Sequence, residues 1–331
     1  MKGLALREAF FYLSRMKRIG ITIGDINGIG PEVALKAVGR YRWPKDVEFI
    51  FLGSEGLIRE QAKAMQIPVS RKMGFEDVGR AFQPASGEIR ANASRLAEQA
   101  IHRAVEGCLS GKFAAMVTAP ICKEGFHKAG INVPGHTELL AELTGTKNFG
   151  MMLMGGGLRV MLVTRHLPLS EVPAALTRKN IREHIELTGQ ALKLFGITNG
   201  KIGVCGLNPH AGDGGVLGRE EIELINPAIR AARKKGFNVS DAVPADTLFF
   251  QALEKQYDAV VAMYHDQGLG PLKMVGFDEG INVTLGLPII RTSPDHGTAF
   301  GIAGKNKASP KSMKNALALA IEMASKPNPW K

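Results

Sequence analysis

The sequence predicts an α/β fold with a mostly parallel sheet. Short apolar runs typical of buried strands alternate along most of the chain with longer segments whose apolar residues recur at helical spacing. The length of 331 residues is enough for one large domain or two lobes. Because no repeat, low-complexity tract or long linker interrupts the pattern, we expect any two lobes to be intimately joined.

The first half of the chain predicts alternating strands and helices. Residues 19–23 form an apolar run, and Pro31 favours a helix start soon after it, because proline fits the first helical position. Residues 92–108 place apolar and small side chains on one helical face. The other predicted elements of this half are strands at 47–52 and 114–117 and a helix at 55–65.

The second half continues this pattern with one antiparallel insertion. Residues 150–163 hold two apolar runs on either side of Gly155, Gly156 and Gly157, which predicts a hairpin. After the hairpin, apolar runs of strand length again alternate with helical patterns, which favours parallel pairing. These elements are predicted helices at 181–195, 219–235 and 311–325 and predicted strands at 201–205 and 258–263.

The net charge of +11 indicates a negatively charged binding partner, either a nucleic acid or a small anionic substrate. Residues 1–18 hold +4 of this excess, and the remainder is dispersed without a basic stripe interleaved with aromatic residues. That distribution argues against nucleic-acid binding and favours a small phosphorylated or carboxylated substrate. The charged residues of the N-terminal segment are Lys2, Arg7, Glu8, Arg15, Lys17 and Arg18.

Residues 1–18 are expected to be an extension outside the catalytic fold. Their apolar residues are typical of a short amphipathic helix, but Arg7 and Glu8 interrupt it and no cleavage site is evident. Met16 directly precedes the first predicted strand, so a functional start there is a hypothesis. A peptide containing residues 1–15 in the mass spectrum of the native protein would refute it.

The apolar runs and the cysteines of the sequence indicate in which cellular compartment the protein is expected. No run of about 18 apolar residues is present, so we expect neither a transmembrane helix nor a membrane partner. Cys108, Cys122 and Cys205 are an odd number of cysteines without CxxC spacing. This usage predicts a reducing compartment, the cytoplasm, rather than a disulfide framework.

Three histidines share one local context. His166, His210 and His265 each follow a short apolar run, at the point where a buried strand gives way to a loop. In an open α/β sheet the carboxyl ends of the strands line the ligand crevice. Three imidazoles brought to one crevice would hold a divalent metal and leave positions open for substrate oxygen. The alternative is three unrelated polar residues at strand ends.

Two further segments are candidates for ligand contact. Residues 24–32 are glycine-rich and lie between a predicted strand and a predicted helix. Their glycine spacing fits neither the GxGxxG fingerprint nor the phosphate loop. They either line a ligand crevice with backbone donors or form a tight turn. His136 and Thr137 lie at a predicted helix start, where anions are favoured. They either contact a substrate anion or serve in ordinary capping, with Thr137 as the N-cap.

Three polar residues follow the last of the three histidines. Lys273 and Arg291 next to a metal crevice would suit an anionic substrate. Asn282 and Arg291 lie in or at the edge of apolar, strand-like segments, where an unpaired polar group is costly. These three residues are therefore candidate substrate contacts, the alternative being solvated surface.

Several segments carry a family resemblance. Residues 294–299, with His296, Gly297 and Thr298, resemble the cofactor loop of the isocitrate and isopropylmalate dehydrogenase superfamily, whose members lack a Rossmann fingerprint. Residues 19–325 as a whole resemble the 4-hydroxythreonine-4-phosphate dehydrogenase family. The segments concerned are 28–32 (GIGPE), 118–123 (TAPICK), 134–138 (PGHTE), 206–212 (GLNPHAG), 244–247 (PADT), 264–268 (YHDQG) and 291–298 (RTSPDHGT).

The resemblance implies a role for each candidate residue. It implies metal ligation by the three histidines, with zinc, magnesium or cobalt, and a nicotinamide cofactor, NAD or NADP, at the loop around His296. It further implies a homodimer with shared active sites. Lys273 and Asp246 are both candidates for the catalytic base. The substrate contacts that it implies are His136, Thr137, Lys273, Asn282 and Arg291.

The resemblance also implies a reaction and a division into lobes. The reaction is oxidation of 4-phosphohydroxy-L-threonine to a β-keto acid that loses carbon dioxide, and relatives that act on 4-phosphothreonate are the alternative. The expected first lobe is 19–125 with 284–331, on the cofactor side. The expected second lobe is 126–283, with the metal, the substrate and the dimer interface.

Two departures from the family pattern bear on the pocket. Residues 241–243 (DAV) stand where the family usually has Gly-Pro, and residues 25–27 (DIN) stand where many members carry a proline. Both leave the predicted ligands in place but can retune the substrate pocket. A non-redox alternative is a metal-dependent phosphoryl or acyl transferase on a similar fold, and a non-enzyme alternative is a basic nucleic-acid-binding protein.

Overall fold

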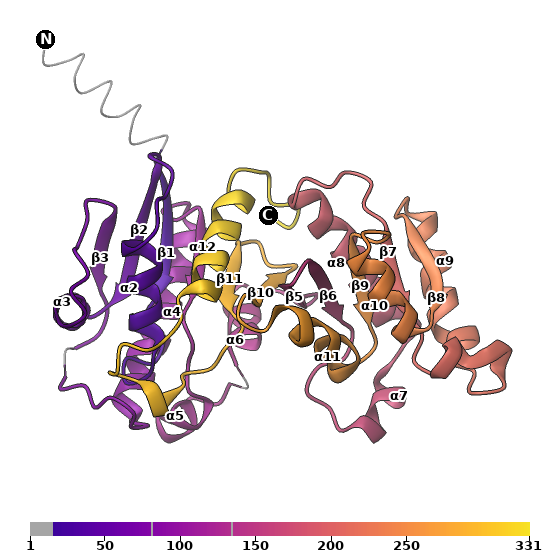
Figure 1. The fold of residues 1–331 in the computed structure, drawn as a ribbon, viewed down its shortest axis with the longest axis horizontal. Coiled ribbons are helices and arrows are strands. Elements are labelled where there is room, and N and C mark those ends of the chain that lie inside the picture. The colour runs from indigo at the N-terminus through magenta and orange to yellow at the C-terminus, as the bar shows by residue number, and fades with distance from the viewer. Residues whose placement is uncertain (1–15, 81, 134) are drawn as a thin grey trace, which may run out of the picture. The chain divides into compact units, whose positions relative to one another are not determined.

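The computed structural model describes residues 16–80, 82–133 and 135–331. The chain divides into two compact units, whose elements are labelled in Figure 1. Unit 1 runs to Thr144 and includes Ile289–Ser325, and unit 2 comprises Gly145–Pro288 with Lys326–Lys331. The amphipathic helix predicted near the N-terminus lies outside the described residues. Strand β1 begins at Lys17, so the predicted extension to residue 18 overlaps the fold.

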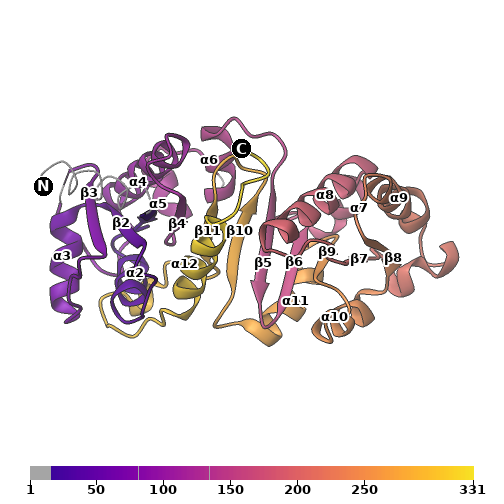
Figure 2. The same ribbon diagram turned by 90° about the horizontal axis from the view of Figure 1, so that it is seen from above.

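Unit 1 is built on a parallel sheet with the strand order β3-β2-β1-β4-β11. Figure 2 shows α4 on one face of this sheet and α2 and α12 on the other. Ile19 and Ile21 of β1 are fully buried, as expected for a strand covered on both faces. The strands are β1 (Lys17–Thr22), β2 (Val47–Gly53), β3 (Met73–Asp77), β4 (Ala115–Thr118) and β11 (Arg291–Pro294). The helices are α2 (Gly30–Gly39), α3 (Glu55–Ala64), α4 (Ala91–Leu109), α5 (Lys123–Lys128), α6 (His136–Leu143) and α12 (Lys311–Met323).

Unit 2 has a mixed sheet with the strand order β10-β5-β6-β9-β7-β8. Strands β10, β5 and β6 pair antiparallel, and β6, β9, β7 and β8 pair parallel, so the predicted hairpin and the parallel strands are both confirmed. The strands are β5 (Gly150–Gly155), β6 (Leu158–Leu162), β7 (Ile202–Cys205), β8 (Val239–Val243), β9 (Ala259–Ala262) and β10 (Ile281–Leu285). The helices are α7 (Val172–Ala175), α8 (Arg178–Leu194), α9 (Asn226–Lys234), α10 (Ala245–Leu253) and α11 (His265–Gly276).

The helices follow the faces that their sequences predict. In α4, Ala97, Ala100 and Ala104 are fully buried, so small side chains let this helix approach the sheet closely. In α8, Thr177 and Asn180 form a reciprocal capping box at the start of the helix. No helix in the described ranges combines the length and the apolarity that crossing a membrane requires.

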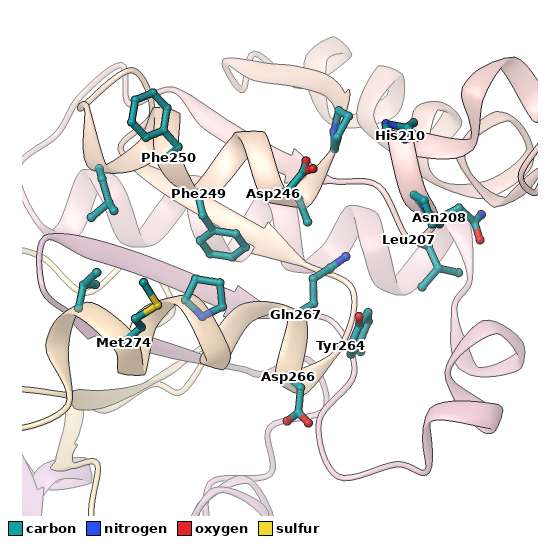
Figure 3. A pocket seen from close by; sticks show the side chains of 16 residues that line it. Leu207, Asn208, His210, Asp246, Phe249, Phe250, Tyr264, Asp266, Gln267 and Met274 are labelled. Atoms are coloured by element: carbon teal, nitrogen blue, oxygen red, sulfur yellow. The ribbon is translucent and has the colours of Figure 1, made fainter.

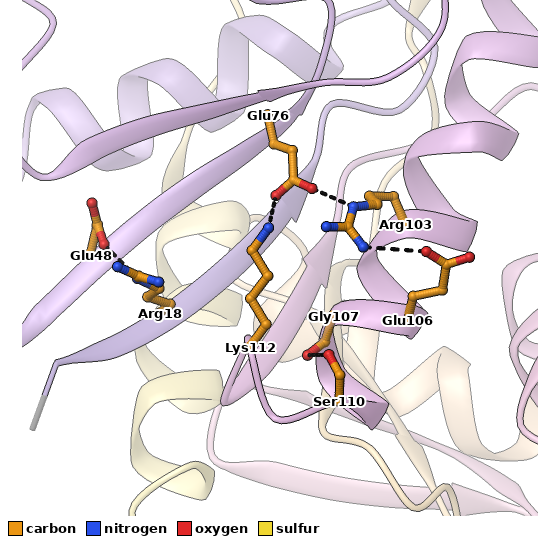
Figure 4. A network of polar contacts seen from close by, with 8 residues as sticks. All are labelled: Arg18, Glu48, Glu76, Arg103, Glu106, Gly107, Ser110 and Lys112. Carbon is orange, nitrogen blue, oxygen red and sulfur yellow. Dashed lines mark hydrogen bonds and ion pairs between the residues drawn. The ribbon is translucent and has the colours of Figure 1, made fainter. Parts of the chain in front are cut away.

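Strand β3 was not predicted, because only Met73 of its residues is buried and no apolar alternation marks it. Polar contacts stabilise this edge strand (Figure 4). Glu76 of β3 accepts a hydrogen bond from Arg103 of α4. Its second carboxylate oxygen accepts from Lys112 at 2.6 Å. The strand is therefore held by side-chain charges that a pattern of hydrophobicity does not contain.

The boundaries of the two units differ from those expected. The first boundary lies after Thr144 rather than after residue 125, because α5 and α6 pack against α4 of unit 1. The chain re-enters unit 1 at Ile289 rather than at 284, since β10 pairs with β5 of unit 2. The last six residues also belong to unit 2, where Trp330 Nε1 donates to Gln190 Oε1 at 2.6 Å.

Candidate active site

The three histidine segments end at one edge of the unit 2 sheet. Strands β6, β9 and β7 stand side by side in this order and run parallel. His166 follows β6, His265 follows β9 and His210 follows β7. Because the carboxyl ends of neighbouring parallel strands meet at the same edge, the fold brings the segments that carry the predicted metal ligands to one side of the sheet.

A threonine links two of these segments directly. Thr164, two residues before His166, donates through Oγ1 to the carbonyl of Met263 at 2.7 Å. The amide of Thr164 donates to the same carbonyl at 3.1 Å. Met263 lies two residues before His265, so these bonds fix the two histidine-bearing strand ends against each other.

A glutamine joins the third segment to them. Gln267 accepts a hydrogen bond from the Met263 amide through Oε1 and donates through Nε2 to the Gly206 carbonyl, both at 2.7 Å. Gly206 begins the loop that carries His210. The three strand ends therefore form one hydrogen-bonded framework.

The structure brings two of the three predicted ligand rings together. The ring centroids of His166 and His265 lie 5.7 Å apart. His265 Nδ1 lies 2.7 Å from Asp266 Oδ1, and such a carboxylate partner fixes the orientation of a ligand imidazole. His210 does not complete the set: within the described ranges no three His, Cys, Asp or Glu side chains are grouped so that they could hold a metal ion.

His210 lines a pocket of its own between the loop after β7 and helices α10 and α11 (Figure 3). Asp246 and Gln267 also line this pocket. Tyr264 and Asp266 line both this pocket and the hollow that holds His166 and His265. His210 thus lines a different pocket from His166 and His265, and the two pockets share Tyr264 and Asp266 as lining residues.

The other predicted residues of unit 2 lie on neighbouring elements. Asp246 is exposed in the first turn of α10, and its Oδ1 accepts from the amide of Thr247 at 2.7 Å. Lys273 is half-buried on α11, with Nζ 5.9 Å from the ring centroid of Phe277. Asn282 lies on β10, and its Oδ1 is buried without a hydrogen-bond partner among the described residues. That oxygen is available to a ligand.

Unit 1 contains a buried cation at the start of β11. Arg291 is 2% exposed, and its Nε and Nη2 donate to Thr118 Oγ1 at 3.1 and 2.6 Å. Burial lowers the pKa of Arg291 from its usual value to about 9, and the nearby charge of Glu138 partly offsets this effect. The guanidinium is still charged at neutral pH, and a buried cation of this kind favours an anionic ligand.

His136 and Thr137 belong to the same unit as Arg291. They are the first two residues of α6, whose N-cap is Gly135, so the prediction of Thr137 as the N-cap is wrong. Gly135 has an extended backbone at this N-cap position, and no side chain caps the helix. Burial, and secondarily Arg291, lowers the pKa of His136 well below its usual range. Its Nε2 is buried without a hydrogen-bond partner among the described residues, which suits contact with a ligand.

The predicted cofactor loop packs against the glycine-rich turn of unit 1. The amide of Ile29 donates to the Thr298 carbonyl at 2.9 Å. A Cβ on Gly28 would come within 2.8 Å of that same oxygen, so only glycine permits this approach. His296 Nδ1 lies 3.1 Å from the Gly297 carbonyl. The turn at 24–30 therefore supports the loop that carries His296, Gly297 and Thr298.

A buried ion pair fixes the end of the same loop. Lys36 and Glu32 of α2 lie 2.6 Å apart, and both side chains are almost inaccessible to solvent. Lys36 Nζ also donates to the carbonyls of Asn306 and Ala308, and Glu32 Oε1 accepts from the Ala308 amide. The pair is fully hydrogen-bonded, as a buried pair must be to persist. It holds residues 306–308 on α2.

Asp25 is a buried carboxyl group that the sequence pattern did not single out as a site residue. Its Oδ1 accepts from the Asn27 amide at 3.0 Å, whereas Oδ2 is buried without a hydrogen-bond partner among the described residues. Burial raises the pKa of Asp25 from 3.8 to about 6, and the bond from Asn27 only partly offsets this effect. Ionisation of the Asp25 carboxyl group therefore costs more free energy in the folded protein than in the unfolded chain.

That cost predicts how stability depends on pH. The folded pKa is raised, so the contribution of Asp25 is present below pH 3.8 and is lost as pH rises through about 6. Replacing Asp25 with Asn is expected to raise the free energy of unfolding by up to about 3 kcal/mol at about pH 7.5 and to have little effect at about pH 4. Urea unfolding at the two pH values measures this, with the exposed Asp278→Asn as control. An equal effect at both values would contradict it.

Three polar residues that hold predicted site residues or their segments were not predicted as site residues: Thr118 in unit 1, and Gln267 and Glu221 in unit 2. Thr118 closes a strand that was predicted, and Gln267 follows His265 by two residues, so proximity in sequence was the available signal for both. Glu221 carried no signal, because it lies in a charged helical stretch that reads as solvated surface, yet it is 2% exposed.

Known proteins match this chain over most of its length. A profile of the family described as pyridoxal phosphate biosynthetic protein PdxA matches residues 45–320. A protein of Oceanobacillus iheyensis, named provisionally as a D-threonate 4-phosphate dehydrogenase, is 42% identical over 329 residues, 94% of this chain and 99% of that protein. A 4-hydroxythreonine-4-phosphate dehydrogenase of Geobacter metallireducens is 42% identical over 323 residues, 93% of this chain and 95% of that protein.

Solved structures agree with the sequence relatives. A crystal structure of 4-hydroxythreonine-4-phosphate dehydrogenase from Klebsiella pneumoniae superposes with a TM-score of 0.82 at 38% identity, over 93% of this chain and 99% of that chain. Isocitrate dehydrogenase from Methylococcus capsulatus superposes with a TM-score of 0.50 at 14% identity, over 94% of this chain and 88% of that chain. The second likeness concerns the fold alone, and it confirms the predicted isocitrate dehydrogenase-like fold class.

The fold and the relatives together define the class of protein as an α/β oxidoreductase of the isocitrate dehydrogenase-like fold. Within that class the chain belongs to the pyridoxal phosphate biosynthetic protein PdxA family. The resemblance predicted from the motifs is confirmed, and so is the prediction that the chain is an enzyme.

Proposed function

We propose that this enzyme oxidises the 3-hydroxyl of 4-phosphohydroxy-L-threonine, with NAD or NADP as hydride acceptor and one divalent metal ion per active site. The product, 2-amino-3-oxo-4-phosphooxybutanoate, then loses carbon dioxide to give 3-amino-2-oxopropyl phosphate, a step towards pyridoxine 5'-phosphate. The proposal rests on the sheet order, because the segments of His166, His210 and His265 follow three adjacent parallel strands at one edge of the sheet. Relatives at 42% identity bear the name of this activity.

The side chains of the three histidines are of a kind that binds divalent metals. Imidazole nitrogens suit zinc, cobalt and other divalent ions, whereas magnesium prefers oxygen ligands. His166 and His210 are exposed and His265 is half-buried, so their rings are open to an ion from solvent. Asp266 orients His265 in the way that ligand histidines usually require. When bound, the ion supplies Lewis acidity towards a substrate hydroxyl.

Each unit, taken by itself, carries cationic candidates for contact with an anionic group. In unit 1, Arg291 offers a buried guanidinium held by Thr118, and His136 and Thr137 lie at the start of α6, where backbone amides favour anions. In unit 2, Lys273 offers a second cation. We propose that each of these cations is a contact for a phosphate or carboxylate group.

Two residues of unit 2 would complete the polar contacts. Asn282 offers a buried carbonyl oxygen without a partner among the described residues, which suits a donor on the substrate. Asp246 lines the same pocket as His210, whereas Lys273 does not line it, which favours Asp246 of the two candidate bases. A base must lie within reach of the hydroxyl proton that it removes.

The nicotinamide cofactor would bind at the loop of His296, Gly297 and Thr298. The glycine-rich turn and the pair of Glu32 and Lys36 hold this loop against α2. A loop that is held before the cofactor arrives costs less ordering on binding. The cofactor supplies the redox chemistry, and the protein orients it.

The test is a turnover assay with a small panel of substrates. Reduced nicotinamide is expected to form from 4-phosphohydroxy-L-threonine in the presence of a divalent metal and to be abolished by a chelator. Reduction with D-threonate 4-phosphate alone would instead support the second candidate, which the naming of the relative from Oceanobacillus iheyensis favours. Release of inorganic phosphate without cofactor reduction would contradict both candidates.

A homodimer with shared active sites follows from the same proposal. Phe250 on α10 and Met274 on α11 are 63% and 88% exposed and line one pocket, and Phe277, directly after α11, is 75% exposed. Large exposed apolar side chains of this kind mark an association surface. A second copy of the chain is the occupant we propose, because Phe250 and Met274 line the same pocket as His210. Coverage of this surface would then also shield the site from water.

Introducing charge on this surface is expected to dissociate the dimer. The variant with Phe250→Glu and Met274→Glu should weaken the dimer at least about 100-fold, since truncating a central apolar anchor alone costs 2 kcal/mol or more. Sedimentation measures the state, and Leu109→Glu on the exposed face of α4 is the matched control. A wild-type protein that sediments as a monomer at all concentrations and yet turns over would contradict the shared site.

A further inference from the structure

The loop that carries His210 has an uncommon backbone. His210, Ala211, Gly212, Asp213 and Gly214 all have positive φ, with values of 53°, 52°, 83°, 43° and 64°. Residues with a Cβ disfavour this region, and a run of such residues is rarer still. Strained backbone of this kind persists only where the surrounding structure over-determines it. Something outside the loop must therefore hold it.

The carboxylate of Glu221 holds the start of this loop. The side chain is buried, and Oε1 accepts from the amides of Leu207 and Asn208, each at 2.8 Å. Its Oε2 accepts from the side-chain amide of Asn208 at 3.0 Å. These three hydrogen bonds offset the cost of burying the charge of Glu221. They also give the loop amides of Leu207 and Asn208 an acceptor.

The glycines of the loop are fitted to this carboxylate. A Cβ on Gly206 would lie 3.1 Å from Glu221 Oε1, and a Cβ on Gly212 would lie 2.6 Å from Oε2. The backbone therefore wraps around the carboxylate on both sides of His210. The Gly206 carbonyl accepts in addition from Gln267, so the loop is attached at its start to the segment that follows His265.

Glu221 reaches the loop from a local irregularity of its helix. It begins a π-helical turn, η3 (Glu221–Ile225), which leads into α9. Such turns insert an extra residue and are frequent at functional sites. Ile225, at the other end of the turn, is fully buried and anchors it in the core. The carboxylate is thus presented to the loop by a rigid element.

We propose that Glu221 is a positioning residue for His210: it fixes the backbone of the 206–212 loop, and with it the position from which this imidazole reaches a metal ion, without touching substrate or cofactor. This inference rests on the proposed function. Loss of an outer hydrogen-bonding partner typically lowers metal affinity about 10- to 100-fold. Here the loss of the Glu221 hydrogen bonds would act on the backbone of the loop that carries His210, not on the imidazole ring itself.

Titration of the metal-free full-length protein with Co²⁺ tests the inference. Glu221→Ala is expected to weaken Co²⁺ binding about 10- to 100-fold and to alter the visible d–d spectrum of the bound ion. Glu221→Gln, which keeps an oxygen for the two loop amides but presents an amide to Asn208, should be intermediate. Glu223→Ala is the matched control, because Glu223 lies in the same turn, is exposed and pairs with Arg219.

The outcomes separate this inference from the proposal beneath it. Unchanged Co²⁺ affinity and spectrum in Glu221→Ala, with only a lowered melting temperature, would overturn the positioning role. Failure of the wild-type protein to bind Co²⁺ would overturn the proposed function itself. Should Glu221→Ala not fold, Glu221→Gln decides: wild-type affinity and spectrum refute the role, and a weakened, altered site supports it.

Discussion

Replacing His210 with Ala is expected to lower kcat by at least about 1,000-fold, because Lewis-acid stabilisation by a metal ion is worth several kcal/mol and each 1.36 kcal/mol is a factor of ten. The same change should abolish tight binding of Co²⁺ or Zn²⁺. His210 is exposed, so its loss should leave the melting temperature of the metal-free protein almost unchanged. Turnover, metal affinity and thermal unfolding are the three measurements.

The control for this variant is His102→Ala. His102 is exposed on α4 of unit 1, far along the chain from the histidine framework, so turnover should be unaffected. His166→Ala and His265→Ala should resemble His210→Ala in both turnover and metal affinity. If His210→Ala kept wild-type metal affinity while the other two lost it, His210 would be removed from the ligand set.

Replacing Arg291 with Met should separate activity from stability. Truncating one partner of a buried, charged contact costs about 2–5 kcal/mol, so kcat/KM for the phosphorylated substrate should fall about 30- to 4,000-fold. Burial also depresses the pKa of Arg291, which means that the free protein bears a cost for charging it. Removal of that cost partly offsets the loss of the hydrogen bonds to Thr118, so the ligand-free protein should lose less free energy of unfolding than the variant loses in substrate binding.

Two further variants sharpen this prediction. Arg291→Lys keeps the charge but not the planar fork, so it should recover only part of the lost kcat/KM. Arg95→Met, on an exposed position of α4, should match the wild type in both measurements. A large loss of stability together with unchanged KM would show that Arg291 supports the fold rather than the substrate.

The parts of the fold that could be predicted are those with a strong apolar period. The predicted strand at 19–23 and the predicted helix at 92–108 match β1 and α4 closely, since their buried faces are continuous. Strand β8 escaped, because only Val239 of its residues is buried. Helix α11 escaped as well: it contains Pro271 and starts at His265, which reads as a loop. The predicted elements are thus those with a continuous buried apolar face. A strand at a sheet edge, or one held by charged side chains, shows no regular spacing of apolar residues in the sequence.

The sequence proposes residues for the candidate site, and these stay a prediction, but it does not reveal the hydrogen bonds that hold their segments together. The motif around each histidine pointed to a strand end, and the sheet order confirms that those strands are neighbours. Gln267 and Glu221, which fix the loop of His210, are hydrogen-bonded to backbone groups whose positions depend on the whole sheet. The left-handed turn after Asn208 could not be foreseen either, because most of its non-glycine residues disfavour it.

The coordination shell of the metal-loaded protein tests the central claim most directly. X-ray absorption fine structure of the Co²⁺- or Zn²⁺-loaded enzyme counts the imidazole rings around the ion. We expect three in the wild type and two in His210→Ala, with one ion per chain. A shell of two imidazoles or fewer in the wild type, or one unchanged by His210→Ala, would contradict delivery of all three histidines to one ion.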